Sequence, residues 1–225
     1  MTDNSHNSQV SELISPTKPK LRGVLHLVAF PVALFLGTFL VIASKGSAAK
    51  ISCAIYGASI AILFGISALY HRGKWTRGPH EILQRIDHAD IYIAIAGSYT
   101  PICVLALGGT VSTVVLTIVW TGAFVGIVLS MLWPKAPRIV LVPTYLVVGW
   151  TAIAVLPQLT HGGGIAMVVL ILVSGAFYTL GGIVYSMRKP NPAPNVFGFH
   201  EVFHSFTIAG WITQYVAISL IAYRI

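Results

Sequence analysis

The chain has 225 residues, of which 56% are hydrophobic and only 9% are charged, and its mean hydropathy is +0.81. Soluble domains carry about 25% charged residues, so this composition excludes a soluble globular protein and indicates an integral membrane protein. The net charge of +8 does not indicate a nucleic-acid partner, because basic loops at the cytoplasmic face of a membrane protein account for it.

The N-terminal segment is polar, rich in Ser, Asn and Thr, and lacks the apolar core of a signal peptide. It predicts a disordered cytoplasmic tail at 1–21. The remainder, 22–225, predicts one all-α domain with seven apolar runs, each long enough to cross a hydrocarbon core of about 30 Å. Backbone groups in lipid must be paired within their own segment, so each run predicts a transmembrane helix. The predicted helices cover 23–44, 51–69, 86–107, 111–133, 139–156, 165–185 and 199–223.

The distribution of lysine and arginine predicts the orientation of this seven-helix bundle. With the N-terminus in the cytoplasm, eleven of the 14 basic residues fall in cytoplasmic segments. The three that remain on the outer side are Lys45, Lys50 and Arg224. We therefore expect a cytoplasmic N-terminus and a C-terminus outside.

Two histidines, His200 and His204, lie four residues apart at the start of the last predicted helix. This spacing places both imidazoles on one helix face, one turn apart, so that they can bind the same metal ion. His71 ends the second predicted helix, and the topology brings it to the same cytoplasmic layer. Three neutral imidazoles leave a fourth tetrahedral position for water, which is typical of a catalytic zinc. The sequence therefore predicts a Zn²⁺ site formed by His71, His200 and His204.

Two further polar residues are expected beside this site. Asp87 opens the third predicted helix in the same layer, and Ser67 lies one turn before His71 on the same face. Asp87 is expected to complete the metal shell or to hold the metal-bound water and accept its proton; the alternative is an ion pair with Arg85. Ser67 is expected to hydrogen-bond the water or a substrate carbonyl, and the alternative is a bond to its own helix backbone.

Glu201 completes a His-Glu-x-x-His pattern, in which zinc metalloproteases use the glutamate as a general base. The pattern is short, and no Asp, Glu or His follows His204, so we favour a supporting or interfacial role for Glu201. Of the polar neighbours of Asp87, at most Asp90 is expected to share part of its helix face. We expect no ligand at the remaining histidines, which lack a partner at matching depth or point away from the site: His26, His80, His88 and His161.

Three blocks of the chain resemble the signature blocks of the hemolysin III family, within the progestin and adipoQ receptor superfamily. They are Ser67-x-x-x-His71, the segment 85–101 and the segment 198–204. The resemblance extends from about residue 21 to the C-terminus. It implies a seven-helix fold with a cytoplasmic N-terminus and a zinc ion near the cytoplasmic face, held by His71, His200 and His204, with Asp87 and Ser67 in the surrounding shell.

Receptors of this superfamily resemble lipid amide hydrolases of ceramidase type, whereas the hemolysin III branch is named for a pore-forming, cell-lysing activity and is linked to membrane lipid homeostasis. We therefore expect a zinc-dependent hydrolase in the cell membrane that acts on an amide or ester bond of a membrane lipid. The alternatives are a non-enzymatic membrane sensor, or a pore-forming hemolysin, with a structural zinc. An intramembrane metalloprotease is a weaker alternative, and the sequence leaves the oligomeric state open.

Overall fold

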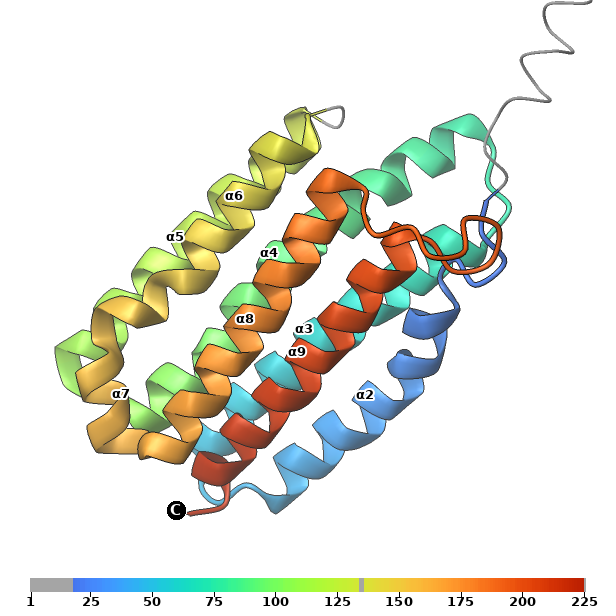
Figure 1. Cartoon of the computed structure of the whole chain (residues 1–225). Helices are drawn as coiled ribbons and strands as arrows, with labels where there is room; N and C mark the ends of the chain where they lie inside the picture. The colour runs from blue at the N-terminus through green and yellow to red at the C-terminus, as the bar shows by residue number, and fades with distance from the viewer. Residues whose placement is uncertain (1–17, 134–135, 225) are drawn as a thin grey trace, which may run out of the picture.

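A computed structural model describes residues 18–133 and 136–224, and this part of the chain is helical throughout, apart from loops and one isolated bridge between Ala193 and Phe197 (Figure 1). Seven helical segments in it are long and apolar enough to span a membrane, which confirms the predicted fold class. The elements are α2 (Val24–Ala43), α3 (Ser47–Arg72), α4 (Arg77–Ala106), α5 (Gly109–Leu132), α6 (Arg138–Gly149), the 3₁₀ helix η1 (Trp150–Val155), α7 (Leu156–Gly163), α8 (Ile165–Met187) and α9 (Phe199–Ala222).

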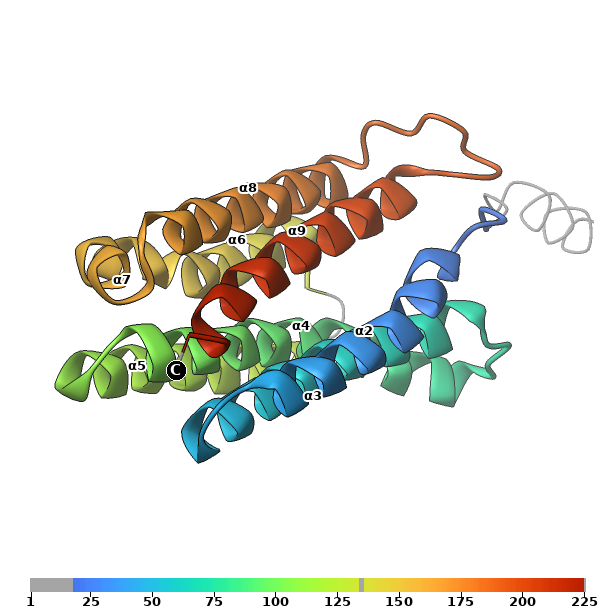
Figure 2. The ribbon, with the colours of Figure 1, turned by 90° about the horizontal axis from the view of Figure 1, so that it is seen from below.

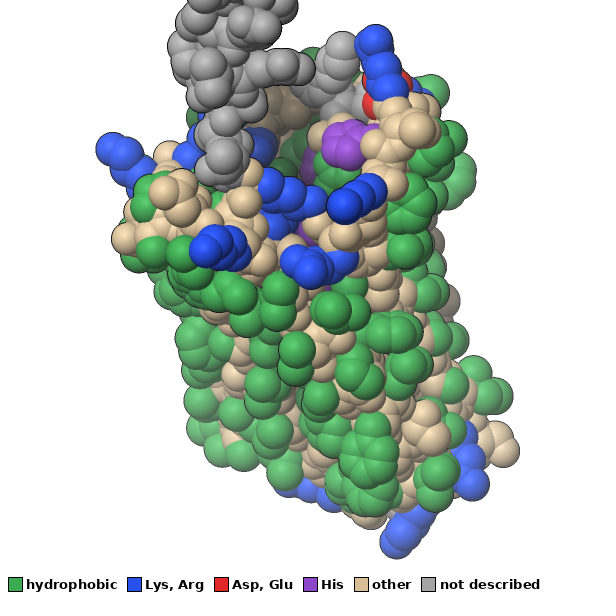
Figure 3. Space-filling view, turned by 90° about the vertical axis from the view of Figure 1, so that its right-hand side faces the viewer, with side chains coloured by type: hydrophobic (Ala, Val, Ile, Leu, Met, Phe, Trp, Pro, Cys, Tyr) green, Lys and Arg blue, Asp and Glu red, His purple; other side chains and the backbone are tan. Residues whose placement is uncertain are grey.

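The surface of the bundle matches a bilayer environment. Large apolar side chains on its flanks are exposed, among them Phe35 at 69%, Ile42 at 71% and Phe124 at 66%. Figure 3 shows hydrophobic side chains covering the flank, while lysine and arginine side chains gather at the two ends. An apolar belt between two charged ends is the arrangement expected of a membrane-spanning bundle.

Two helices extend beyond their predicted ends on the same side of the bundle. α3 continues to Arg72 instead of residue 69, and α4 begins at Arg77 instead of residue 86. The first turns of α4 are polar and exposed, so hydrophobicity alone does not reveal them as helix. The 30 residues of α4 span about 45 Å, which exceeds a hydrocarbon core and lets the polar start of the helix project beyond it.

The fifth span is longer and less regular than predicted, because α6 ends at Gly149 and α7 follows after the short η1 segment. A break in a helix frees backbone groups that need partners inside a membrane. The Tyr99 hydroxyl of α4 supplies two of these partners. It donates to the Gly149 carbonyl at 2.6 Å and accepts from the Ala152 amide at 2.7 Å.

The helices are arranged in two layers. Figure 2 shows α2, α3, α4 and α5 in one layer and α6, α7 and α8 in the other. α9 packs along α8 and also contacts α2 and α4, so it joins the layers. The contact between α3 and α4 is close, since a Cβ atom on Gly97 would lie 2.2 Å from the Ser59 hydroxyl oxygen.

Three chain segments meet at one end of the bundle, at the upper right of Figure 1: the start of α2, the connection from α3 to α4, and the start of α9. This end holds His71, His200 and His204 and is called the histidine end below. Of the predicted disordered tail, residues 1–17 lie outside the described residues. Residues 18–21 lead into a turn at 20–23 at the histidine end, where the amides of Lys20 and Leu21 donate to the carbonyls of Asn195 and Val196 at 3.0 and 3.1 Å.

Candidate metal centre

The histidine end positions three imidazoles through two helix ends. His71 lies in the last turn of α3, and His200 and His204 lie in the first turns of α9. The α9 start is fixed by Glu201, whose Oε2 accepts the Gly198 amide at 2.7 Å and so closes the first turn. Because the helix begins here, both α9 histidines fall on one face and point toward α3.

The three imidazoles form one compact, buried group. Each offers a ring nitrogen, and these atoms lie within 4.8 Å of one another. The Nε2 atoms of His71 and His200 are 3.1 Å apart, and the exposed fractions of His71, His200 and His204 are 7%, 8% and 2%. The structure thus brings together all three predicted metal ligands from two helices that are far apart in the sequence.

The donor set fits a metal ion. Zn–N distances of about 2.0–2.1 Å in a tetrahedral site separate two ligand nitrogens by about 3.3 Å, close to the spacing of His71 and His200. His204 Nδ1 is buried and has no hydrogen-bond partner among the described residues. A buried imidazole nitrogen without a partner is costly, and a bound cation relieves that cost. The group can therefore hold a metal ion, and its all-nitrogen ligands suit zinc.

Asp87 and Ser67 lie beside the three histidines, as expected. The Asp87 carboxylate approaches His71 at 3.8 Å, measured from Oδ2 to Nε2. Ser67 is buried and lines the same cavity as Asp87. Asp87 does not pair with Arg85, whose Nη1 instead donates to the Met131 carbonyl at 3.4 Å. A carboxylate with a serine beside it therefore adjoins the candidate metal ligands.

His26 corrects one expectation from the sequence. It was expected to have no partner at matching depth, but its ring stacks on that of His204, with centroids 3.7 Å apart and planes 8° apart. His26 is buried, and neither of its ring nitrogens has a hydrogen-bond partner among the described residues. The reason is topological: α2 begins at the histidine end, so its first turn reaches the same layer as α9. His26 does not belong to the compact three-nitrogen group.

The neighbours of Asp87 also differ from expectation. His88, not Asp90, lines the same cavity as Asp87. Asp90 is 1% exposed and does not line that cavity, and neither of its carboxylate oxygens has a hydrogen-bond partner among the described residues. At this end the cavity is lined by two adjacent residues of α4, Asp87 and His88. A prediction based on one helix face therefore misses His88. His80 and His161 are exposed and lie outside the three-histidine group.

Glu201 is fully buried and engaged on both oxygens. Arg22 Nε donates to Oε1 at 2.5 Å, and the Gly198 amide donates to Oε2. Arg22 belongs to the turn before α2, in which the Lys18 ammonium also donates to the His71 carbonyl. The Glu201 carboxylate thus ties the N-terminal turn to α9 above the histidines. This engagement agrees with a supporting role and leaves no free oxygen for the general base of a protease.

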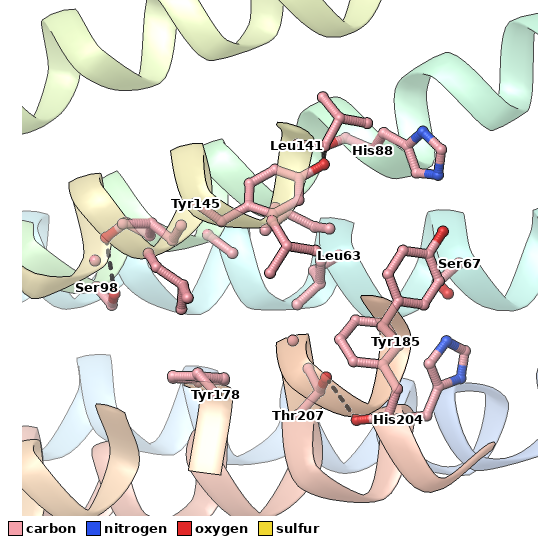
Figure 4. Close-up of a pocket in the computed structure, with 18 of the residues that line it drawn as sticks. Leu63, Ser67, His88, Ser98, Leu141, Tyr145, Tyr178, Tyr185, His204 and Thr207 are labelled. Carbon is pink, nitrogen blue, oxygen red and sulfur yellow. Dashed lines mark hydrogen bonds between the residues drawn. The ribbon is translucent and has the colours of Figure 1, made fainter. Parts of the chain in front are cut away.

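A cavity extends from the histidine end into the bundle. It has a volume of about 150 Å³ and is lined mainly by apolar side chains. His200 and Gln214 of α9 both line it, and this helix length corresponds to about 21 Å. Figure 4 shows Ser67, His88, Tyr185 and His204 at one end, with Ser98 and Tyr178 toward the other. A long apolar channel therefore ends at the candidate metal ligands.

The fold and this site define a class of protein: a seven-span membrane protein with a buried three-histidine group at one end. The chain belongs to the haemolysin-III related family, whose model matches residues 14–215. This confirms the resemblance to the hemolysin III family, and no solved structure gives a significant match.

Curated relatives agree with the family assignment. The Hemolysin-3 homolog of Bacillus subtilis (strain 168) is 36% identical over 193 residues, which cover 84% of both chains. Hemolysin-3 of Bacillus cereus is 28% identical over 196 residues, covering 84% of this chain and 82% of the relative. The human Monocyte to macrophage differentiation factor is 24% identical over 179 residues, covering 78% and 72%. The last match supports the link to the progestin and adipoQ receptor superfamily.

Proposed function

We propose that this protein is a zinc-dependent membrane hydrolase that cleaves an amide or ester bond of a membrane lipid. The observation that carries the proposal is the position of the three-histidine group, beside a partly buried carboxylate and at the end of a long apolar cavity. In this proposal His71, His200 and His204 hold the ion. A zinc ion in such a site supplies a Lewis acid for an acyl carbonyl and makes water acidic near neutral pH.

The protein's own groups would divide the remaining work. Asp87 stands within reach of the histidines and can accept the proton of the attacking water as a general base. Ser67 lines the same cavity as Asp87 and can orient its carboxylate or donate to the substrate carbonyl oxygen. The surrounding helices exclude bulk water, which strengthens these interactions.

The cavity supports a lipid as the substrate. Its walls include Leu63, Ile95 and Leu146, and its length along α9 matches an extended acyl chain better than a compact ligand. An acyl chain in this channel would bring its carbonyl carbon to the histidine end. A peptide substrate has no comparable use for a long apolar channel.

We also propose that the histidine end faces the cytoplasm and that the protein resides in the cell membrane. Most basic residues lie in the segments at this end, which supports a cytoplasmic location. A role in membrane lipid homeostasis would follow from hydrolysis of a lipid within the same bilayer.

A second function has a specific observation in its favour. The bacterial relatives carry the name Hemolysin-3, and the Asp87 carboxylate is close enough to His71 to act as a fourth ligand. A closed four-ligand shell is typical of structural zinc. In that case the metal would tie α3 to α9 in a membrane sensor or a pore-forming hemolysin without turnover.

Turnover separates the two functions. Zinc-loaded wild-type protein is incubated with a panel of acyl amides and acyl esters of different head groups, and release of free fatty acid is measured beside Asp87→Asn. Fatty-acid release that requires zinc and is lost in Asp87→Asn supports the hydrolase. Absence of release from every acyl lipid, with zinc bound, would leave the structural-metal function.

A further inference from the structure

Arg138 occupies an unusual position for a basic residue at the end of a membrane helix. It is the first residue of α6, and its guanidinium carbon lies 4.3 Å from the centroid of the Tyr185 ring and 5.4 Å from that of Phe199. The same two rings flank His200, with centroids 5.6 and 6.2 Å from its own. The guanidinium therefore lies about one aromatic ring away from His200, and it contacts Tyr185, which lines the cavity at the histidine end.

No described carboxylate neutralises this guanidinium. The ion pairs among residues 18–133 and 136–224 join Arg22 to Glu201, His71 to Asp87 and Arg77 to Glu81. Nη1 of Arg138 is buried and has no hydrogen-bond partner in this part of the chain. A desolvated guanidinium N–H without an acceptor is unfavourable, and aromatic rings compensate only part of that loss. The position is therefore suited to an anion from outside the chain.

The residues that line the cavity indicate what kind of molecule carries the anion. His88 lines the cavity at the same end and adds an imidazole there (Figure 4). Away from the histidine end the cavity is lined mainly by apolar side chains. A molecule that fills it and also binds Arg138 is therefore apolar along its length and anionic at one end. A free inorganic anion would accept the hydrogen bonds of the guanidinium but would leave the apolar cavity empty.

We infer that Arg138 binds the phosphate of a lipid headgroup whose acyl chain lies in the cavity. This inference rests on the proposed function for the claim that the bound lipid is a substrate, and it narrows the substrate class to acyl lipids with a phosphate. A planar guanidinium binds phosphate through two parallel hydrogen bonds. In a glycerophospholipid the phosphate stands only a few bonds from an acyl carbonyl, which agrees with the single ring between Arg138 and His200.

The test measures binding, so that it stands apart from turnover. Zinc-loaded protein in a neutral maltoside detergent is titrated with dioctanoyl phosphatidic acid, dioctanoylglycerol and inorganic phosphate. The variants are Arg138→Gln and, as matched control, Arg188→Gln, which removes one exposed arginine from the same end of the bundle. Zinc content equal to wild type verifies folding. Arg138→Met, which keeps an unbranched apolar stem over Tyr185, replaces Arg138→Gln if that variant fails the check.

The wild type is expected to bind phosphatidic acid at least about tenfold more tightly than diacylglycerol, and Arg138→Gln to remove that preference while Arg188→Gln retains it. Equal affinities for the two lipids in the wild type, or equal losses in both variants, would overturn the inference. Binding of inorganic phosphate at the same concentrations as phosphatidic acid would assign the site to free phosphate and overturn the lipid. The proposed hydrolase function is tested separately, and it would be contradicted if no acyl lipid releases fatty acid.

Discussion

The ring of His26 stacks almost parallel on the ring of His204, with their centroids 3.7 Å apart. His26 comes from the first turn of α2 and His204 from the second turn of α9, so the contact joins the two ends of the chain. Phe64 also packs against His26, with the ring centroids 4.9 Å apart. The imidazole of His204 is thus held in one orientation by flat packing.

This stacking predicts a positioning role for His26. Replacing it with Ala removes the flat surface beside His204, and zinc affinity is expected to fall about tenfold, as for other residues that orient a metal ligand. His26→Phe keeps a flat ring there and is expected to bind zinc as the wild type does. Both affinities are measured by competition with a chromophoric chelator. Loss of zinc in His26→Phe would contradict a packing role and indicate that His26 is itself a ligand.

The contacts of Glu201 predict that its replacement lowers stability and does not act directly on catalysis. Glu201→Ala leaves Arg22 without its partner and the Gly198 amide without an acceptor, so the free energy of unfolding should fall by about 3 kcal/mol. The exposed pair of Arg77 and Glu81 at the same end provides the control, and Glu81→Ala should change little. Thermal unfolding in detergent reports both. A Glu201 variant with unchanged stability but without fatty-acid release would contradict the supporting role and indicate a catalytic one.

The position of Asp87 predicts that its replacement affects turnover without affecting metal binding. As the proposed general base, its replacement by Asn should lower fatty-acid release at least about 100-fold while the zinc content stays at the wild-type level. Ser67→Ala should cost less, about tenfold, because the serine acts through Asp87 or through one hydrogen bond. Fatty-acid release and zinc content are both measured for the two variants. Zinc loss in Asp87→Asn would identify Asp87 as a fourth ligand and favour the structural-metal function.

The apolar cavity predicts a dependence on chain length. Ser98 lines it far from the histidine end, so Ser98→Phe should shorten the channel without touching the metal ligands (Figure 4). Release of long acyl chains is expected to fall about tenfold or more, while release of short chains is retained. A series of substrates that differ only in acyl length measures the effect. Equal losses for all lengths would show that the chain lies elsewhere.

The seven spans and the three clustered histidines could be predicted from the sequence because both follow from local patterns. Apolar runs mark spans, and the spacing of His200 and His204 marks a helix face, so alternating helix directions then place His71 at the same end. The start of α2 at that end also follows from this topology, which makes His26 a residue that the same reasoning could have found.

Other features depend on contacts that no local pattern contains. The break between α6 and α7 is stabilised by the Tyr99 hydroxyl of another helix. The pairing of Arg22 with Glu201 joins residues 179 positions apart. The early start of α4 lies in polar sequence outside the apolar core, where hydrophobicity does not distinguish helix from loop. Tertiary packing decides the first two of these features, and it becomes visible only when the whole chain is folded.

The metal content of the detergent-purified protein tests the central claim most directly. Elemental analysis of the wild type is compared with His71→Ala and His204→Ala, and thermal unfolding verifies that each preparation is folded. We predict about one zinc per chain in the wild type and none in either histidine variant. A well-folded wild type without zinc, or variants that keep their zinc, would contradict the three-histidine centre and with it the hydrolase built upon it.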